Sequence, residues 1–260
     1  MAKWDDEAPR WARWVLPVAG LTVFLLLWQA IATWGVANAA LLPGPWQVAH
    51  NLWAWIQGGG FSGHLQATVL GTLGGLAIGA GLGFVLGVVV GEVRVLDRAV
   101  YPMALALQAM PMVAIAPLVI VWFGIGLASK VALVAIGTFF VMFINTVAGM
   151  HTAPPEWLDM GRAFGGGRWR IAWQIKIRAS LDYVFGGLEV CAALSFILCV
   201  VGEFLAATAG LGYFIRAASY DIDAAGMFAA VVVLAVLASL LAALVRFLHH
   251  RIVFWKYRKA

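Results

Sequence analysis

Long apolar stretches limit the possible folds of this chain more strongly than any motif does. About 20 consecutive apolar residues form a helix that crosses the hydrocarbon core of a bilayer, and the sequence contains several such stretches. Hydrophobic residues make up 63% and charged residues 11% of its 260 residues, whereas soluble domains contain roughly a quarter charged residues. We therefore expect an all-α membrane protein with a single transmembrane domain over residues 1–260.

Segments that carry Pro, Gly or charge separate the apolar stretches and mark where the chain turns. The first stretch, residues 15–37, is longer than the ~7–15 apolar residues of a signal peptide, so we expect it to remain as a span. Six transmembrane helices result. They cover approximately residues 15–36, 64–91, 101–124, 130–150, 183–207 and 224–246.

The distribution of Lys and Arg predicts the orientation of these spans. If the N-terminus lies inside, all but two of the 17 basic residues fall in cytoplasmic segments, and only Lys130 and Arg216 lie outside. Cytoplasmic loops carry such an excess of Lys and Arg, so both termini and the segment 151–182 should be cytoplasmic. The net charge of +5 therefore reflects topology, and no nucleic-acid partner is expected because the basic residues form no separate domain.

The predicted outer segment between the first two spans is rich in tryptophan. "PWQVAHNLWAWI" places Trp46, Trp53 and Trp55 in a short helix, and indole rings favour the interface between lipid and water. We expect an anchor that contacts membrane lipid. A cap that binds substrate is the alternative.

The second predicted span carries a glycine at every fourth position. A helix without side chains along one ridge allows a neighbouring helix to approach closely, which is a main source of helix association in lipid. The ridge therefore packs either within the chain or at a dimer seam. It consists of Gly71, Gly75, Gly79, Gly83, Gly87 and Gly91.

Motifs for catalysis are absent from the sequence. It contains no G-x-x-x-x-G-K-[ST] loop for ATP, no H-E-x-x-H zinc motif and no G-x-S-x-G elbow. Cys191 and Cys199 are eight residues apart in one apolar run and fit small core residues better than a disulfide. Glu189 and Glu203 lie within a span with no obvious partner nearby in sequence. We expect neither an enzyme nor a metal site.

One long segment, "WLDMGRAFGGGRWRIAWQIKIRAS" from Trp157, mixes charge, glycine and aromatic rings. Pro154-Pro155 should end the fourth span, and a short helix from Glu156 to Phe164 should stop at the three glycines that follow. A second, amphipathic helix should come next, with Trp169 and Trp173 among its apolar members. The segment is therefore either a docking element or a plain loop at the membrane surface.

At these residues the chain resembles the permeases of binding-protein-dependent ABC importers. Their cytoplasmic loop bears the pattern E-A-A-x-x-x-G, nine residues, then I-x-L-P. Here Asp replaces Glu, Met-Gly replaces Ala-Ala, Ile replaces Leu and Arg replaces Pro. The pattern falls on Asp159-Met160-Gly161, Gly165, Ile175, Ile177 and Arg178.

Four further stretches resemble the permeases for taurine, alkanesulfonates, nitrate and the thiamine pyrimidine precursor. They are "LLPGPWQV" from Leu41, "PMVAIAPLVIVWFGIGLASK" from Pro111, "FFVMFINTVAGM" from Phe139 and "VVGEFLAATAGLGYFI" from Val200. This resemblance implies a type I importer permease of the bacterial inner membrane that pairs with a second copy, two ATPase subunits and a periplasmic binding protein. ATP and Mg would be used by the partner ATPase, and this chain would bind no cofactor.

The resemblance also implies two sets of site residues. The coupling helix, which would fit a groove on the ATPase, includes Trp157, Asp159, Met160, Gly161, Arg162, Phe164 and Gly165. The third and fifth spans should face the dimer axis. Candidates for the translocation path are therefore Gln108, Met110, Met112, Asn145, Ser195 and Glu203.

Each path candidate has helix packing as its alternative, and Glu203 should lie near outer water or meet a cation such as Arg216. The implied function is ATP-driven import of a small solute such as a sulfonate, taurine or nitrate. A secondary transporter or channel without an ATPase is the alternative. The identity and charge of the solute do not follow from the sequence.

Overall fold

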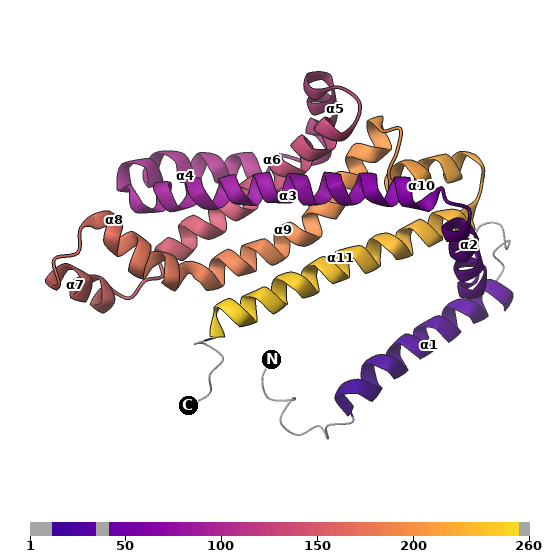
Figure 1. The fold of residues 1–260 in the computed structure, drawn as a ribbon, viewed down its shortest axis with the longest axis horizontal. Coiled ribbons are helices and arrows are strands. Elements are labelled where there is room, and N and C mark those ends of the chain that lie inside the picture. Colours follow the sequence, from indigo (N-terminus) through magenta and orange to yellow (C-terminus); the bar gives the residue numbers. More distant parts are fainter. Residues whose placement is uncertain (1–11, 35–41, 255–260) are drawn as a thin grey trace. The chain divides into compact units, whose positions relative to one another are not determined.

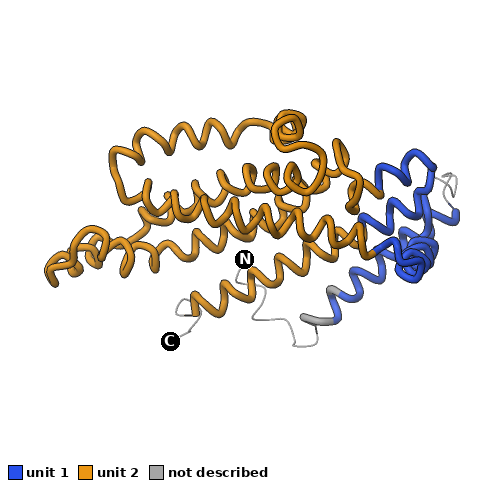
Figure 2. Tube along the Cα trace, turned by 45° about the horizontal axis from the view of Figure 1, so that its top comes forward, with its two compact units in different colours: residues 1–61, 215–231 blue, residues 62–214, 232–260 orange. Residues whose placement is uncertain are grey.

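The computed structural model describes residues 12–34 and 42–254, and over these residues the regular structure is entirely helical (Figure 1). The predictions made for the two chain ends, including Lys3, Arg10, Lys256, Arg258 and Lys259, lie outside the described residues. The chain divides into two compact units. Unit 1 comprises Met1–Phe61 with Ile215–Val231, and unit 2 comprises Ser62–Phe214 with Val232–Ala260 (Figure 2).

Unit 1 contains α1 (Ala12–Trp34), α2 (Pro45–Gln57) and residues 215–231. The Trp28 indole joins these parts, because its Nε1 donates a hydrogen bond to the Pro43 carbonyl at 3.1 Å and its ring lies 5.7 Å from that of Phe228. In α2, which is the predicted tryptophan-rich helix, Trp46 and Trp53 are exposed. Their location at a membrane surface stays a prediction.

Unit 2 is built on three long helices that pack side by side, α3 (Phe61–Glu92), α6 (Leu127–Met150) and α9 (Ile177–Ala206). Their contacts bury apolar side chains such as Val134 on α6 and Leu198 on α9. The other elements of the unit are α4 (Arg94–Gln108), α5 (Met112–Phe123), α7 (Pro155–Ala163), α8 (Arg168–Ile171), the π-helix η1 (Ala172–Lys176) and parts of α10 (Leu211–Tyr220) and α11 (Ala224–Ile252).

The glycine ridge of α3 packs against α6 of the same chain. A Cβ atom added at Gly83 would lie 2.6 Å from the Phe139 carbonyl oxygen, and one at Gly87 would lie 2.7 Å from Cβ of Thr146. Such distances leave no room for a side chain. Packing within the chain is thus confirmed at these positions of the ridge, and α6 occupies the surface that a dimer seam would need.

The apolar stretch at residues 101–124 forms two helices rather than the single span predicted. α4 begins at Arg94 and ends at Gln108, and α5 begins at Met112, with an angle of 97° between the two. Pro111 lies at the break. Proline has no backbone N–H and disfavours a helical conformation in the residue before it, so the helix ends there.

The segment after the three glycines also differs from the prediction. Instead of a separate amphipathic helix, α8, η1 and α9 form one continuous helical stretch, Arg168–Ala206. Arg178 stands where the loop pattern of the importer permeases has proline. Arginine keeps its backbone N–H and fits a helix well, so the helix continues into the span.

Within the described residues, four helices are long and apolar enough to cross a membrane. The number is five if the bent pair of α4 and α5 counts as one span, and the apolar part of α1 at Val18–Trp34 is shorter. The chain is therefore a helical protein with several candidate spans. The sixth span and the cytoplasmic placement of both termini stay predictions.

Candidate functional site

The short helix α7 is defined at both ends by its sequence. Pro155 is its first residue, where the missing N–H costs nothing. At its other end, Gly165 adopts φ +73°, and the amides of Gly165 and Gly166 donate to the carbonyls of Arg162 and Gly161 at 2.9 Å. This is a glycine-dependent helix end, in which the amides after the helix pair with carbonyls of its last turn.

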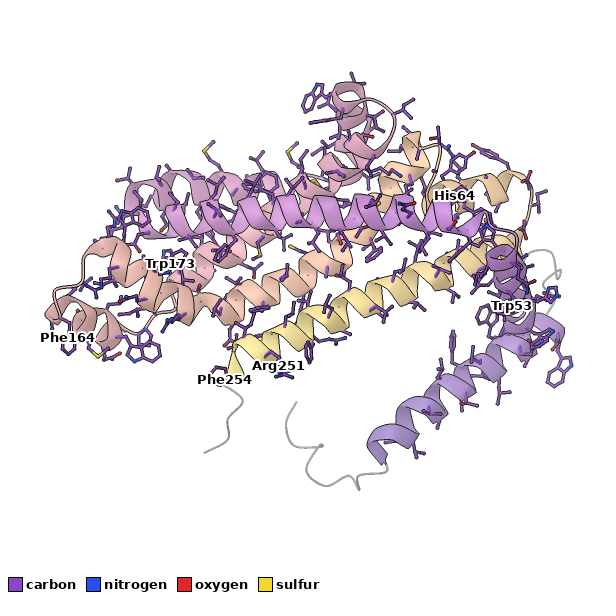
Figure 3. All side chains as sticks on the ribbon, in the orientation of Figure 1. Trp53, His64, Phe164, Trp173, Arg251 and Phe254 are labelled. Carbon is purple, nitrogen blue, oxygen red and sulfur yellow. The ribbon has the colours of Figure 1, made fainter. Side chains whose placement is uncertain are left out.

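One side of α7 presents large apolar side chains to the surroundings. Trp157, Met160 and Phe164 are 51%, 53% and 84% exposed. Their spacing of three and four residues aligns them along one face of the helix. Phe164 lies at the tip of this element and points away from it (Figure 3). We call these three side chains the apolar ridge of α7.

Next to this ridge, at Gly161, α7 packs against the helical stretch that follows. A Cβ atom at Gly161 would lie 2.8 Å from Cδ1 of Ile175 and 3.3 Å from Cγ1 of Ile171. Glycine at this position therefore lets α7 approach α8 and η1 closely. The seven predicted coupling residues all lie in α7 and its C-terminal turn, and Asp159 and Arg162 form an exposed ion pair at 2.9 Å.

A cavity of about 680 Å³ lies between α7, η1 and the end of α3. It is lined by four Arg or Lys side chains and one acidic side chain, Glu92, which was not among the site residues predicted from the sequence. Its position at the end of the glycine ridge was the available signal. The basic residues are Arg94, Arg162, Arg168 and Lys176.

The predicted translocation residues fall into two groups. Gln108 and Met110 are exposed at the break between α4 and α5, and Met112 is half-buried at the start of α5. On the core helices, the Asn145 amide donates to the Val141 carbonyl and the Ser195 hydroxyl to the Ala192 carbonyl, each at 2.8 Å. The side chains of Asn145 and Ser195 therefore each form a hydrogen bond within their own helix. The six residues are thus distributed between the break that separates α4 from α5 and the core helices α6 and α9.

Glu203 is fully buried, and both of its carboxylate oxygens accept hydrogen bonds. Its carboxylate accepts hydrogen bonds from Thr68 (2.8 Å) on α3, from Lys130 (3.2 Å) on α6 and from the Gly212 amide (2.7 Å). Lys130 also donates to the Ala209 carbonyl at 2.9 Å. The cation that meets Glu203 is thus Lys130, whereas Arg216 was the example predicted from the sequence.

Glu189 also has a partner distant in sequence, because Nδ1 of His249 lies 3.4 Å from its carboxylate. The other ring nitrogen of His249 is 3.2 Å from Asp182. Among the described side chains, no group of three or more His, Cys, Asp or Glu residues is arranged to hold a metal ion.

Comparison of the sequence with known proteins identifies the family of this chain. Residues 79–254 match the family described as "Binding-protein-dependent transport system inner membrane component". The chain belongs to this family. The riboflavin transport system permease protein RibX of Chloroflexus aurantiacus is 36% identical, in an alignment that covers 95% of this chain and 91% of RibX.

Other relatives are permeases of the group that the sequence resembled. The formylaminopyrimidine transport permease protein ThiX of Halalkalibacterium halodurans is 29% identical, with 94% of this chain and 96% of ThiX aligned. Permeases for aliphatic sulfonates, taurine and nitrate also match. The group is therefore confirmed, and the chain is an ABC transporter permease related to importers.

A solved structure shares the fold of this permease. A chain of the inward-facing MetNI methionine ABC transporter superposes with a TM-score of 0.60 at 17% identity, covering 80% of this chain and 96% of the other. At this level of identity the likeness concerns the fold alone.

Proposed function

We propose that this chain is the transmembrane subunit of a bacterial ABC importer and that α7 is its coupling helix. Two copies of the chain would assemble with two ATPase subunits in the inner membrane. A periplasmic binding protein would deliver a small solute, and ATP with Mg would be used by the ATPase subunits alone. Six spans with both termini in the cytoplasm belong to this proposal.

The apolar ridge of α7 is the observation that carries the proposal. Three large apolar side chains exposed on α7 and at its C-terminal cap are unfavourable in water and suit an interface with another protein. The exposed ion pair of Asp159 with Arg162 lies on another face of the same helix and supplies polar groups that would orient a partner. The sequence contains no G-x-x-x-x-G-K-[ST] loop for binding ATP, which is consistent with a separate ATPase subunit.

Closure of the ATPase dimer would act on the spans through α7. Because α8, η1 and α9 form one helical stretch on which α7 packs, a displacement of α7 would be transmitted to the core helix α9. The permease would then alternate between inward and outward openings, a rigid-body change driven by the different affinity of its partners for each state.

The translocation path is proposed to include the exposed residues at the bend between α4 and α5, Gln108 and Met110, together with Met112. Asn145 and Ser195 remain candidates on the core helices. Glu203 is a weaker candidate because Thr68, Lys130 and Gly212 already occupy its carboxylate.

Relatives of this chain serve riboflavin, aliphatic sulfonates, formylaminopyrimidine, taurine and nitrate. We propose a small solute from this range. The partner binding protein would perform most of the selection, so the solute is best identified by measuring which of these compounds shifts the melting temperature of that protein.

The test of the coupling helix is the double variant Met160→Ala/Phe164→Ala. Each truncation removes a buried contact of about 1–3 kcal/mol if the ridge fills a groove on the ATPase. We expect the variant to lose ATPase retention on an affinity column and to lose hydrolysis stimulated by the binding protein in proteoliposomes. Arg170→Gln, an exposed residue of α8, is the control and should retain both.

Wild-type retention and stimulation in the double variant would refute the coupling-helix assignment. A secondary transporter or channel is the alternative function. It would transport its solute in proteoliposomes that contain the purified chain and a solute gradient but neither ATPase nor ATP.

A further inference from the structure

Glu92, the last residue of α3, is bonded to the segment on which α7 packs. Its side chain is 5% exposed. Arg168 Nε of α8 lies 3.0 Å from Oε1, and Lys176 Nζ of η1 lies 2.8 Å from Oε2. Arg168 also donates to the backbone carbonyl of Glu92. Both carboxylate oxygens and the last carbonyl of α3 are therefore held by one short stretch of chain.

The position of these cations suits the end of a helix. The C-terminus of a helix carries partial negative charge and unpaired carbonyls, which nearby Arg and Lys side chains stabilise. Lys176 is 19% exposed and Arg168 52% exposed. Because solvent screens an exposed ion pair more strongly, the pair with Lys176 should contribute more than the pair with Arg168.

The α8–η1 stretch contacts α3 and α7 through different side chains. Arg168 and Lys176 meet Glu92, and Ala172 between them is buried with Val88 of α3. Ile171 and Ile175 instead meet α7 at Gly161. The stretch therefore links α7 to α3 as well as to α9. It also includes a π-helical turn, which in proteins often occurs at functional sites.

We propose that Glu92 is a positioning residue that makes α3 follow the movement of α7. This inference rests on the proposed function, in which α7 is moved by an ATPase. Without the Glu92 contacts, α7 still packs on η1 and still presents its apolar ridge, so an ATPase still binds. The end of α3 then loses its direct polar link to the segment that carries α7, and movement reaches α3 only indirectly, through α9 and α6.

Glu92→Gln tests this inference in the complete complex of permease, ATPase and binding protein in proteoliposomes. We expect wild-type ATPase retention and basal hydrolysis, while solute uptake per ATP falls by about tenfold, within the usual range of coupling between sites. Lys176→Gln should act in the same direction. Lys176→Arg keeps the charge and should restore coupling, and Arg170→Gln, in the same turn as Arg168, should match the wild type.

If Glu92 only stabilised the fold, the result would differ. Assembly and uptake would then fall equally, and uptake per ATP would not change. That outcome, or wild-type uptake per ATP in an assembled Glu92→Gln complex, would overturn the inference. If Glu92→Gln does not assemble, Lys176→Gln and Lys176→Arg decide, since coupling must follow the charge at residue 176. Failure of the proposed function is distinct, because the wild-type chain would then retain no ATPase.

Discussion

Glu203 illustrates how the chain keeps an ionisable side chain inside a core of apolar helices. A buried charge is costly unless a partner and hydrogen bonds compensate for it, and this carboxylate has Lys130, Thr68 and the Gly212 amide. Gly210 adopts φ +130° beside it, and a Cβ atom there would overlap the carboxylate. The cluster thus binds the chain between α9 and α10 to α3 and α6.

We expect Glu203→Gln alone to destabilise the protein, since it leaves the Lys130 ammonium buried without a counter-charge. Loss of one partner of a buried ion pair typically costs about 3–5 kcal/mol. The double variant Glu203→Gln/Lys130→Met should recover much of this loss because no unpaired charge remains. Thermal unfolding in detergent measures both effects, and a single variant as stable as the wild type would contradict this account.

At the scale of the helix, close approach decides the packing of α3. Gly83 and Gly81 are two residues apart on this helix, yet a Cβ atom at Gly83 would meet α6 at 2.6 Å, whereas one at Gly81 would meet nothing within 4 Å. Gly83 therefore faces α6, and Gly81, on the same helix, does not.

Gly83→Leu should impair folding by about 1–3 kcal/mol or more, as overpacking does. Gly81→Leu introduces the same side chain at an open position and should be tolerated. The measurement is the yield of monodisperse protein after extraction, together with its melting temperature. Equal yields and equal melting temperatures of the two variants would mean that α3 does not depend on contact with α6.

For the whole molecule, the proposed topology defines which ends of the spans face the cytoplasm. Gly167, directly before α8, and Gly63, near the start of α3, both have open space where a side chain would be added. They lie at opposite ends of the proposed topology. Gly166 is unsuitable, because a Cβ atom there would lie 2.7 Å from the Gly161 carbonyl oxygen.

In a background with Cys191 and Cys199 replaced, Gly167→Cys should react with an impermeant thiol reagent only after the membrane is opened. Gly63→Cys should react in intact spheroplasts. Mass spectrometry of the labelled protein reports both. The reverse pattern would invert the topology, and α7 would then face away from a cytoplasmic ATPase.

The sequence by itself determined the features that depend on neighbours in the chain. Apolar length marked α3, α6, α9 and α11 as long apolar helices, and Pro155 with Gly165 marked the two ends of α7, because spans, prolines and glycines act locally. The sequence also contains Pro111 at the break between α4 and α5, but the direction of the chain after this proline depends on packing.

Only the tertiary structure decided which side chains meet. The partners of Glu203 on α3 and α6 lie 135 and 73 residues away in the chain, and those of Glu92 lie 76 and 84 residues away. Local sequence carries no record of such separations, since the pairing is set by how α3, α6 and α9 pack. A buried charge requires its counter-charge in space rather than in sequence, and that is why packing alone revealed these partners.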